Sequence, residues 1–253
     1  GAGTAAHRRR RGKNSDRPDR ATSMTRGWFI TGTDTGVGKT HIAQALLQAL
    51  GRRGFAAVGM KPIASGCVRT PAGLRSDDAE RLAAASTVPA DYADVNPYAF
   101  EPAIAPHIAA ARAGVELRLE ALGQHFRRLA ARADWVVVEG AGGWDVPFDR
   151  GRTLSAVARA FGLPVILVVG VRLGCINHAL LTGRAVRADG LRFAGWVANR
   201  IDAAFDSADE SIADLDGRLG APRLADVPYG ADAAQWRECA DALLANLLRE
   251  RFS

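Results

Sequence analysis

The chain has 253 residues, of which 48% are apolar and 24% charged, so it can bury a full hydrophobic core. No uncharged apolar run approaches the roughly 20 residues that a membrane-spanning helix needs, so we expect no contact with a membrane. Three widely spaced cysteines, Cys67, Cys175 and Cys239, exclude a disulfide framework and a paired-cysteine metal site. They suit a reducing compartment and predict a cytoplasmic location.

The net charge of +6 is concentrated in residues 1–26. This segment carries eight basic residues against two acidic ones, whereas residues 27–253 carry equal numbers of each. Its near absence of apolar side chains predicts a disordered basic tail or an extension upstream of Met24. An RNA-binding or targeting arm is the alternative interpretation. The charge balance of the remaining chain argues against a nucleic-acid-binding face, so no nucleic-acid partner is expected.

Residues 27–253 are predicted to form a single domain in which short apolar strands alternate with amphipathic helices. Strands are expected at 28–31, 56–59, 135–138, 165–169 and 193–198, with a weaker one at 223–226. Helices are expected at 39–51, 78–86, 116–132, 153–161, 176–189 and 232–250. Most strands are continuous apolar runs, which is typical of strands covered on both faces. The alternation therefore predicts an α/β fold with a mostly parallel central sheet and helices on both faces.

The segment 87–115 interrupts this alternation. It is rich in proline and alanine and is predicted to be a long connection with one short helix. Long ordered connections in compact α/β domains often carry function, so this segment is a candidate lid over a ligand.

A phosphate-binding loop follows the first strand, with the sequence GTDTGVGKT from Gly32 to Thr40. Glycines let backbone N–H groups turn toward phosphate oxygens, and the N-terminus of the following helix adds partial positive charge. Lys39 would reach the β- and γ-phosphates, and the Thr40 hydroxyl would ligate Mg²⁺. The standard pattern begins with glycine where this chain has Thr33, but the strand–loop–helix context still predicts a P-loop and nucleotide binding.

A second motif closes the strand at 135–138. Glu139 follows this apolar strand directly and precedes the glycine-rich turn at 140–143. P-loop proteins place a second metal contact on a carboxylate at such a position, so Glu139 is expected to bind Mg²⁺ directly or through water. A solvated strand end is the alternative interpretation.

Two adjacent acids, Asp77 and Asp78, stand at the start of the helix expected at 78–86. One interpretation is a helix N-cap followed by an acid in the first turn. The other is a third oxygen ligand that completes a magnesium site with Thr40 and Glu139. Spacing alone does not choose between the two acids.

Three further polar residues follow strand ends, which is where ligands bind in open α/β sheets. Lys61 and Ser65 come after the second strand, and Asn199 comes after the strand at 193–198. The ordinary alternatives are a surface lysine, a small-residue loop and a turn cap. The shared position predicts ligand contacts, with Asn199 reading the edge of a base.

Taken in order, these motifs resemble the dethiobiotin synthetase family over residues 27–229. The resemblance rests on the segments GTDTGVGKT at 32–40, KPIASG at 61–66, VNPY at 95–98, PH at 106–107, EGAGGW at 139–144, GVRLGCINH at 170–178 and GWVAN at 195–199. Related ATPases share the phosphate loop but not the segment at 170–178, so the ordered set is far more specific than the loop alone.

The resemblance implies an ATP- and Mg²⁺-dependent enzyme of biotin biosynthesis. An amine of 7,8-diaminononanoate captures CO₂ as a carbamate, and the carbamate oxygen attacks the γ-phosphate of ATP. The second amine then closes the cyclic urea, dethiobiotin, and expels phosphate. Positioning and charge neutralisation carry most of such a phosphoryl transfer.

The resemblance also implies roles for single residues. Lys39 would neutralise charge on the transferred group, and Lys61 would bind the carbamate and the γ-phosphate. Substrate would be positioned by Thr35, Ser65 and Gly143. The phosphates and the metal would be held by Gly36, Val37, Gly38, Lys39, Thr40, His41, Asp78, Glu139, Gly140, Ala141 and Gly142. Among these, Thr40, Asp78 and Glu139 would be the metal ligands, which leaves Asp77 as the capping candidate.

Asn199 would recognise adenine in the implied enzyme, next to Arg200 and helped by the backbone of Val227, Pro228 and Tyr229. The family enzyme is a homodimer in which the neighbouring subunit holds the substrate carboxylate. The segment 173–177 begins a helix, whose N-terminus suits a carboxylate. Gly174, Cys175 and Asn177 are therefore interpreted as contacts made across a dimer, and Cys175 is given no nucleophilic role.

Two positions depart from the family pattern. Gly36 stands where some members carry a glutamate, and Arg200 stands where an aspartate is common, which leaves base and ribose recognition open. Two other functions are alternatives: a related P-loop synthetase with another substrate, and a partitioning or switch ATPase. The latter often carries a signature lysine five residues before Lys39, where this chain has Asp34.

Overall fold

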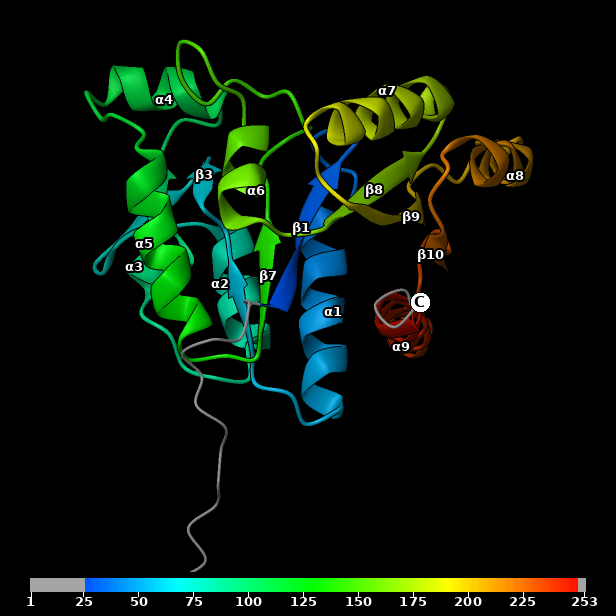
Figure 1. Cartoon of the computed structure of the whole chain (residues 1–253), viewed down its shortest axis with the longest axis horizontal. Helices are drawn as coiled ribbons and strands as arrows, with labels where there is room; N and C mark the ends of the chain where they lie inside the picture. Colours follow the sequence, from blue (N-terminus) through cyan, green and yellow to red (C-terminus); the bar gives the residue numbers. More distant parts are fainter. Residues whose placement is uncertain (1–25, 250–253) are drawn as a thin grey trace, which may run out of the picture.

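The computed structural model describes residues 26–249, so residues 1–25 of the predicted tail at 1–26 and the predicted end of the last helix lie outside the described residues. Arg26, assigned to the tail, is instead the first residue of the first strand. The central strands are β1 (Arg26–Gly32), β2 (Ala57–Met60), β7 (Trp135–Glu139), β8 (Val165–Val171), β9 (Phe193–Arg200) and β10 (Arg223–Val227). They form one six-stranded sheet in the order β10-β9-β8-β1-β7-β2, and every neighbouring pair is parallel (Figure 1). The predicted α/β class is confirmed.

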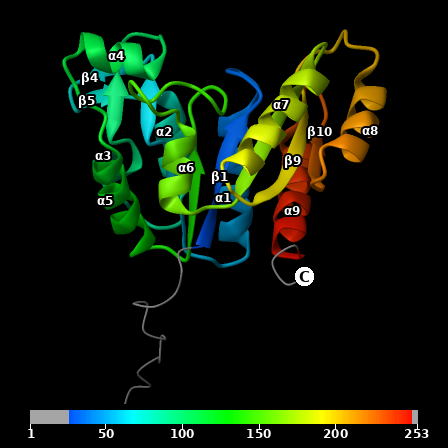
Figure 2. The ribbon, with the colours of Figure 1, turned by 45° about the horizontal axis from the view of Figure 1, so that its top comes forward.

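Helices cover both faces of this sheet (Figure 2). One face carries α1 (Lys39–Arg52), α2 (Asp77–Ala85) and α9 (Ala233–Arg249). The other carries α5 (Leu119–Ala130), α6 (Ser155–Phe161), α7 (Cys175–Ala188) and α8 (Ala208–Arg218). Strand residues alternate between these layers: Trp28 and Ile30 pack toward α1 and α9, whereas Phe29 packs toward α5 and α6. Because both layers are apolar, every position of such a strand favours an apolar side chain.

The connection at 87–115 contains more regular structure than the single short helix predicted for it. It holds α3 (Tyr92–Val95), β6 (Tyr98–Phe100) and α4 (Pro106–Arg112). The strand β6 pairs in parallel with β3 (Ile63–Ser65), and a small hairpin of β4 (Val68–Thr70) and β5 (Gly73–Arg75) lies between β3 and α2. Strands of three residues are too short to show a periodic pattern, which is why the sequence analysis missed them.

The helix α8 was also not predicted. Its sequence is polar along most of its length, and its buried residues are Ser211, Ile212 and Leu215. Such a short apolar stripe gives a weak helical signal. No helix within residues 26–249 combines the length and the apolar character that crossing a bilayer requires.

The candidate site residues lie together at the carboxyl ends of the strands in the central sheet. The phosphate loop follows β1, Lys61 follows β2, and Glu139 is the last residue of β7. These three strands are neighbours in the sheet and run in the same direction, so their carboxyl ends lie side by side. Ligands bind at this end of parallel sheets.

Candidate active site

The phosphate loop turns directly from β1 into α1. Gly38 is the N-cap residue of α1 and has a φ of 95°, a left-handed conformation that favours glycine. A Cβ atom on Gly38 would lie 2.3 Å from Nδ2 of Asn199, so a side chain does not fit there. The loop therefore packs tightly against the end of β9 and exposes its backbone N–H groups at a helix N-terminus, which is a site for anions.

Lys39 is buried inside this loop. Its Nζ donates to the backbone carbonyl of Asp34 at 2.8 Å. Burial, together with repulsion from the Lys61 ammonium, lowers the pKa of Lys39 from 10.5 to about 8. The ammonium is thus poorly compensated, and phosphate oxygens would supply the negative charge that its surroundings lack.

Four side chains meet beside Lys39, and we call Thr40, Lys61, Asp78 and Glu139 the Lys61 cluster. Nζ of Lys61 lies 2.6 Å from Glu139 Oε1 and 2.8 Å from Asp78 Oδ2. The Thr40 hydroxyl lies 2.8 Å from Asp78 Oδ1 and 2.9 Å from Glu139 Oε1. The Lys61 and Glu139 side chains are only 5% and 1% exposed. The fold therefore brings Thr40 and Glu139, 99 positions apart in the sequence, into hydrogen-bond contact at the carboxyl ends of the strands.

Lys61 and Asp78 hold each other in their charged forms. Burial by itself would lower the pKa of Lys61, but the Glu139 and Asp78 carboxylates outweigh it and raise that pKa above 10.5. Burial would likewise raise the pKa of Asp78, yet the Lys61 ammonium holds it below 3.8. Lys61 is therefore a cation, and Asp78 an anion, throughout the neutral range.

The Lys61 cluster fits a magnesium ion chemically. Thr40, Asp78 and Glu139 offer only oxygen atoms, which are the ligands that Mg²⁺ prefers. Oε2 of Glu139 is buried and has no hydrogen-bond partner, so this oxygen is available for a further contact. Residues 26–249 contain no group of three or more His, Cys, Asp or Glu side chains with metal-binding geometry, since here the third oxygen comes from a threonine.

The neighbouring helix start separates the two adjacent acids. Ser76 is the N-cap of α2, and its hydroxyl accepts from the Ala79 N–H at 3.4 Å. Asp77 pairs with Arg81 at 2.8 Å on the same helix and takes no part in the Lys61 cluster. The capping role left to Asp77 is therefore wrong, because α2 begins at Asp77 itself and the cap falls one residue earlier. Asp78 belongs to the Lys61 cluster.

A cavity of 740 Å³ opens from the Lys61 cluster. Its walls include the predicted substrate residues Thr35 and Ser65, and Ser65 Oγ is buried without a hydrogen-bond partner. The sequence analysis missed the wall made by residues 103–106 and Val146. Residues 103–106 lie in the connection at 87–115, the candidate lid, and Pro106 also belongs to the PH segment of the family resemblance.

The residues predicted to bind the base lie on the far side of the phosphate loop, and we call Asn199, Arg200 and 227–229 the base region. None of them lines the 740 Å³ cavity. Asn199 Nδ2 donates to the Val37 carbonyl at 2.8 Å, which leaves Oδ1 as its free acceptor. Tyr229 is 59% exposed. Close by, the His41 ring stacks on Trp236 with ring centroids 5.7 Å apart.

The unusual Arg200 has partners of its own. Its guanidinium pairs with Asp226 through two hydrogen bonds of 3.0 Å and with Asp209 at 2.6 Å. These contacts raise the pKa of Arg200 further. Arg200 therefore ties the end of β9 to the end of β10 and is not directed at a ligand as a free cation.

The predicted dimer contacts stand apart from the cavity. Gly174 is the N-cap of α7, Asn177 is exposed, and neither lines the cavity of the same chain. Cys175 is 2% exposed and packs in the hydrophobic core beneath α7, which suits a structural role. The preceding Arg172 pairs with Asp34 of the phosphate loop at 2.7 Å.

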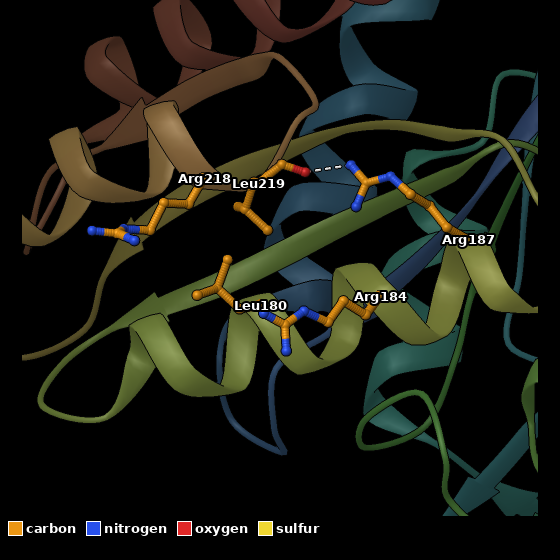
Figure 3. Close-up of a pocket in the computed structure, with 5 residues that line it drawn as sticks. All are labelled: Leu180, Arg184, Arg187, Arg218 and Leu219. Carbon is orange, nitrogen blue, oxygen red and sulfur yellow. Dashed lines mark hydrogen bonds between the residues drawn. The ribbon is translucent and has the colours of Figure 1, made fainter.

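A second cavity, of 270 Å³, lies between α7 and α8 (Figure 3). Leu180, Arg184, Arg187, Arg218 and Leu219 line it. Arg187 donates to the Leu219 and Gly220 carbonyls, and Arg218 pairs with Asp214 at 2.7 Å. Arg187 therefore joins α7 to the end of α8, whereas the Arg218 pair lies within α8, and no predicted site residue lines this cavity.

Comparisons with solved structures identify the class of fold to which this chain belongs. A parallel sheet with a phosphate loop after β1 defines the P-loop nucleotide-binding fold, and solved structures agree. The cell division ATPase MinD of Pyrococcus furiosus aligns with a TM-score of 0.57 over 89% of this chain and 99% of its own, at 17% identity. The MinC:MinD complex of Aquifex aeolicus gives a TM-score of 0.55 at 14% identity. Likeness at such identities shows the fold alone.

Sequence relatives define the family. A family model described as an AAA domain matches residues 26–236. The ATP-dependent dethiobiotin synthetase BioD of Pseudomonas paraeruginosa is 54% identical over 207 residues, covering 81% of this chain and 91% of its own. The enzyme of the same name from Xanthomonas oryzae pv. oryzae is 52% identical over 206 residues, covering 81% and 92%. The chain belongs to the ATP-dependent dethiobiotin synthetase family.

Proposed function

We propose that this chain is a dethiobiotin synthetase that uses ATP and CO₂ to convert 7,8-diaminononanoate into dethiobiotin, ADP and phosphate. The observation that carries the proposal is the Lys61 cluster, with Lys61 Nζ within 2.8 Å of Asp78 and Glu139, in the wall of a cavity that Ser65 also lines. A buried cation between the phosphate loop and a second cavity wall suits a reaction that joins a carboxylated amine to a phosphoryl group.

The reaction has three balanced steps. One amine of the substrate attacks CO₂ and gives a carbamate, with release of one proton. A carbamate oxygen attacks the γ-phosphorus of ATP, ADP leaves, and a carbamic–phosphoric anhydride forms. The second amine attacks the carbonyl carbon of this anhydride and loses a proton, the C–O bond to phosphate breaks, and inorganic phosphate leaves as the cyclic urea closes.

The phosphate loop would bind ATP. Backbone N–H groups at 36–41 and the N-terminus of α1 face the phosphates, and Lys39 neutralises the oxygens of the transferred group. Thr40, Asp78 and Glu139 would hold a Mg²⁺ ion, which when bound screens the charge of the β- and γ-phosphates. The backbone at 140–142 borders the same space.

The other side of the cavity would bind the substrate. Lys61 carries its positive charge throughout the neutral range, so it can hold the carbamate oxygen and the γ-phosphate together. The hydroxyls of Thr35 and Ser65 and the backbone at Gly143 would orient the diamine. Residues 103–106 and Val146 line this side of the cavity and would border the bound diamine.

The base region would bind adenine. Because Asn199 Nδ2 is committed to the Val37 carbonyl, its Oδ1 can accept from the 6-amino group of adenine, a group that guanine lacks. The backbone at 227–229 would border the base, with Arg200 in a supporting position that holds Asp226.

Two chains would form the complete enzyme, with the substrate carboxylate held by Gly174, Cys175 and Asn177 of the neighbouring subunit. The helix α7 begins at this point, and its N-terminal N–H groups suit a carboxylate. A mixture of Lys61→Met and Asn177→Asp variants tests this arrangement. Shared sites should restore about a quarter of the wild-type activity, because hybrid dimers have one intact site each. A mixture that is no more active than its two components would contradict the dimer site.

The reaction itself is tested by phosphate release with ATP, Mg²⁺ and bicarbonate, with and without 7,8-diaminononanoate, while dethiobiotin is sought by mass spectrometry. We expect product only with the diamine. Arg184→Ala, which changes the cavity between α7 and α8, serves as the control and should match the wild type. ATP turnover that ignores the diamine would contradict the proposed substrate and would leave the nucleotide site in place.

A further inference from the structure

Residues 92–96, which comprise α3 and Asn96, lie between two segments that carry the Lys61 cluster, and we call them the 92–96 bridge. On one side the bridge binds the backbone of Lys61. The Lys61 N–H donates to the Val95 carbonyl at 2.7 Å, and Asn96 Nδ2 donates to the Lys61 carbonyl at 2.7 Å. Asn96 is buried, so its position is fixed together with that of Lys61.

On the other side the bridge binds the start of α2. The Tyr92 hydroxyl accepts from the Ser76 N–H at 2.8 Å and lies 3.4 Å from Asn96 Oδ1, to which it can donate. Ser76 is the N-cap of α2, two residues before Asp78. One phenol oxygen therefore links the helix that carries Asp78 to the amide that holds Lys61.

The bridge has a rigid support. Asp94 is buried and accepts from Arg128 Nε and contacts His125 Nδ1, both at 2.8 Å, on α5. At the opposite end of α2, Ser86 Oγ accepts from the Gly59 N–H of β2 at 3.0 Å. The start of α2 is thus attached to a part of the molecule that is itself fixed.

The Tyr92 ring has a separate role from its hydroxyl. The Arg75 guanidinium lies over the ring at 4.1 Å from its centroid, a cation–π contact that needs no oxygen. Removal of the oxygen alone would keep this packing and would leave the Ser76 N–H without its partner.

We propose that Tyr92 is a positioning residue, whose hydroxyl fixes the start of α2 so that the Asp78 carboxylate stands at the correct distance from Lys61, Thr40 and Glu139. The inference rests on the proposed function, because it takes Asp78 as a metal ligand. Groups that orient metal ligands commonly contribute 10-fold or more to metal affinity. The proposal explains why a loop far from the phosphates in sequence is packed against both Lys61 and α2.

The experiment compares Tyr92→Phe with Tyr98→Phe. The Tyr98 hydroxyl also accepts from a backbone N–H, that of Arg118 at 3.1 Å, but it is not linked to α2. The dissociation constant of Mn²⁺ is measured by electron paramagnetic resonance in the presence of a non-hydrolysable ATP analogue, with melting temperatures alongside. Asp78→Asn provides the reference for loss of the ligand itself.

We expect Tyr92→Phe to weaken Mn²⁺ binding about 10-fold and Tyr98→Phe to change it less than about 2-fold, although both variants lose one tyrosine–backbone hydrogen bond. Wild-type Mn²⁺ affinity in Tyr92→Phe, with weakened binding in Asp78→Asn, would overturn the positioning role and spare the proposed metal site. Equal weakening in the two tyrosine variants would also overturn it. Wild-type affinity in Asp78→Asn would overturn the metal site itself, and the positioning role with it.

Discussion

The Lys61 cluster is built from buried charges, whereas the base region is built from an amide, backbone groups and charges that face the surface. In the cluster, Lys61 neutralises two carboxylates within 2.8 Å and is itself 5% exposed. In the base region, Arg200 is 26% exposed and pairs with Asp226 and Asp209, whereas Asn199 binds the Val37 carbonyl and Val227 is buried in the core. The difference matches the two tasks proposed for these regions: stabilising charge that moves during a reaction, and selecting a neutral base.

The two regions also differ in the size of the effect expected when a residue is replaced. A buried ion pair loses several kcal/mol when one partner is removed, because the other charge remains in a low-dielectric environment. A neutral hydrogen bond contributes about 1 kcal/mol. We therefore expect changes in the Lys61 cluster to affect turnover and stability strongly, and changes in the base region to affect mainly the affinity for nucleotide.

The largest effect is expected from Lys61→Met. The variant should lose about 10²–10³-fold in kcat, because charge on the transferred phosphoryl group is no longer neutralised. Without nucleotide it should also lose about 3–5 kcal/mol in the free energy of unfolding, since Glu139 becomes a buried, unpaired carboxylate. Steady-state kinetics and urea denaturation measure the two effects. Arg69→Met, which breaks the exposed pair with Glu101, is the control and should leave both unchanged. Turnover within a few-fold of wild type would contradict the role given to Lys61.

A moderate effect is expected from Asn199→Ala. It should raise the apparent KM for ATP about 10-fold with little change in kcat, and it should reduce the preference for ATP over GTP, because one neutral contact to the base is lost. The matched control is Asn246→Ala, since Asn246 Nδ2 donates to the Leu224 carbonyl at 2.8 Å, away from the phosphate loop. An unchanged nucleotide profile would move base recognition to other residues.

A smaller effect follows from the pKa of Lys39, which is about 8 in the free protein. Above this pH the free side chain is neutral, and phosphate binding favours the protonated form. Nucleotide binding should therefore take up a fraction of a proton at pH 8.5 and almost none at pH 6.5. Isothermal titration calorimetry in two buffers of different ionisation enthalpy measures the uptake. Proton release at pH 8.5 would contradict the lowered pKa.

The smallest effect is expected from Asp77→Asn. Asp77 forms an exposed pair with Arg81 one turn along α2, and such pairs contribute about 0.3–0.5 kcal/mol. The concentration of Mg²⁺ required for half-maximal activity should stay within about 2-fold of wild type, whereas Asp78→Asn should raise it strongly. A comparable rise in both variants would mean that the adjacent acids share one role.

The central sheet could be predicted because its strands are covered on both faces. Val136, Val137 and Val138 pack alternately against opposite helix layers. Because both layers are apolar, such a strand appears in the sequence as a continuous apolar run. The three-residue pairing of β3 with β6 depends on contacts between distant segments, so no local hydrophobic pattern in the sequence predicts it. The helix α8 was not predicted for a related reason: only a narrow stripe of its surface is buried, so its apolar periodicity is weak.

The site was predictable where chemistry demands a particular residue at a particular strand end, as with Lys39, Thr40 and Glu139. The choice between Asp77 and Asp78 was not predictable from spacing, because it depends on which residue caps α2. Ser76 takes that position, which rotates Asp78 toward Thr40 and Asp77 toward Arg81. The hydroxyl of Tyr92 carries no sequence signal, since its partners are a backbone N–H and an amide that the fold brings to it.

The stack of His41 on Trp236 has a spectroscopic consequence. Of the five tryptophans in the chain, Trp28, Trp135, Trp144 and Trp196 are each at most 4% exposed, whereas Trp236 is partly exposed beside the first turn of α1. Emission from the four buried indoles is insulated from solvent and should remain constant. A change in the red part of the fluorescence spectrum on addition of nucleotide would therefore report on the one indole beside the phosphate loop. Trp236 is therefore an intrinsic fluorescent probe of the phosphate loop, and the Trp236→Phe variant, which lacks this signal, is the control.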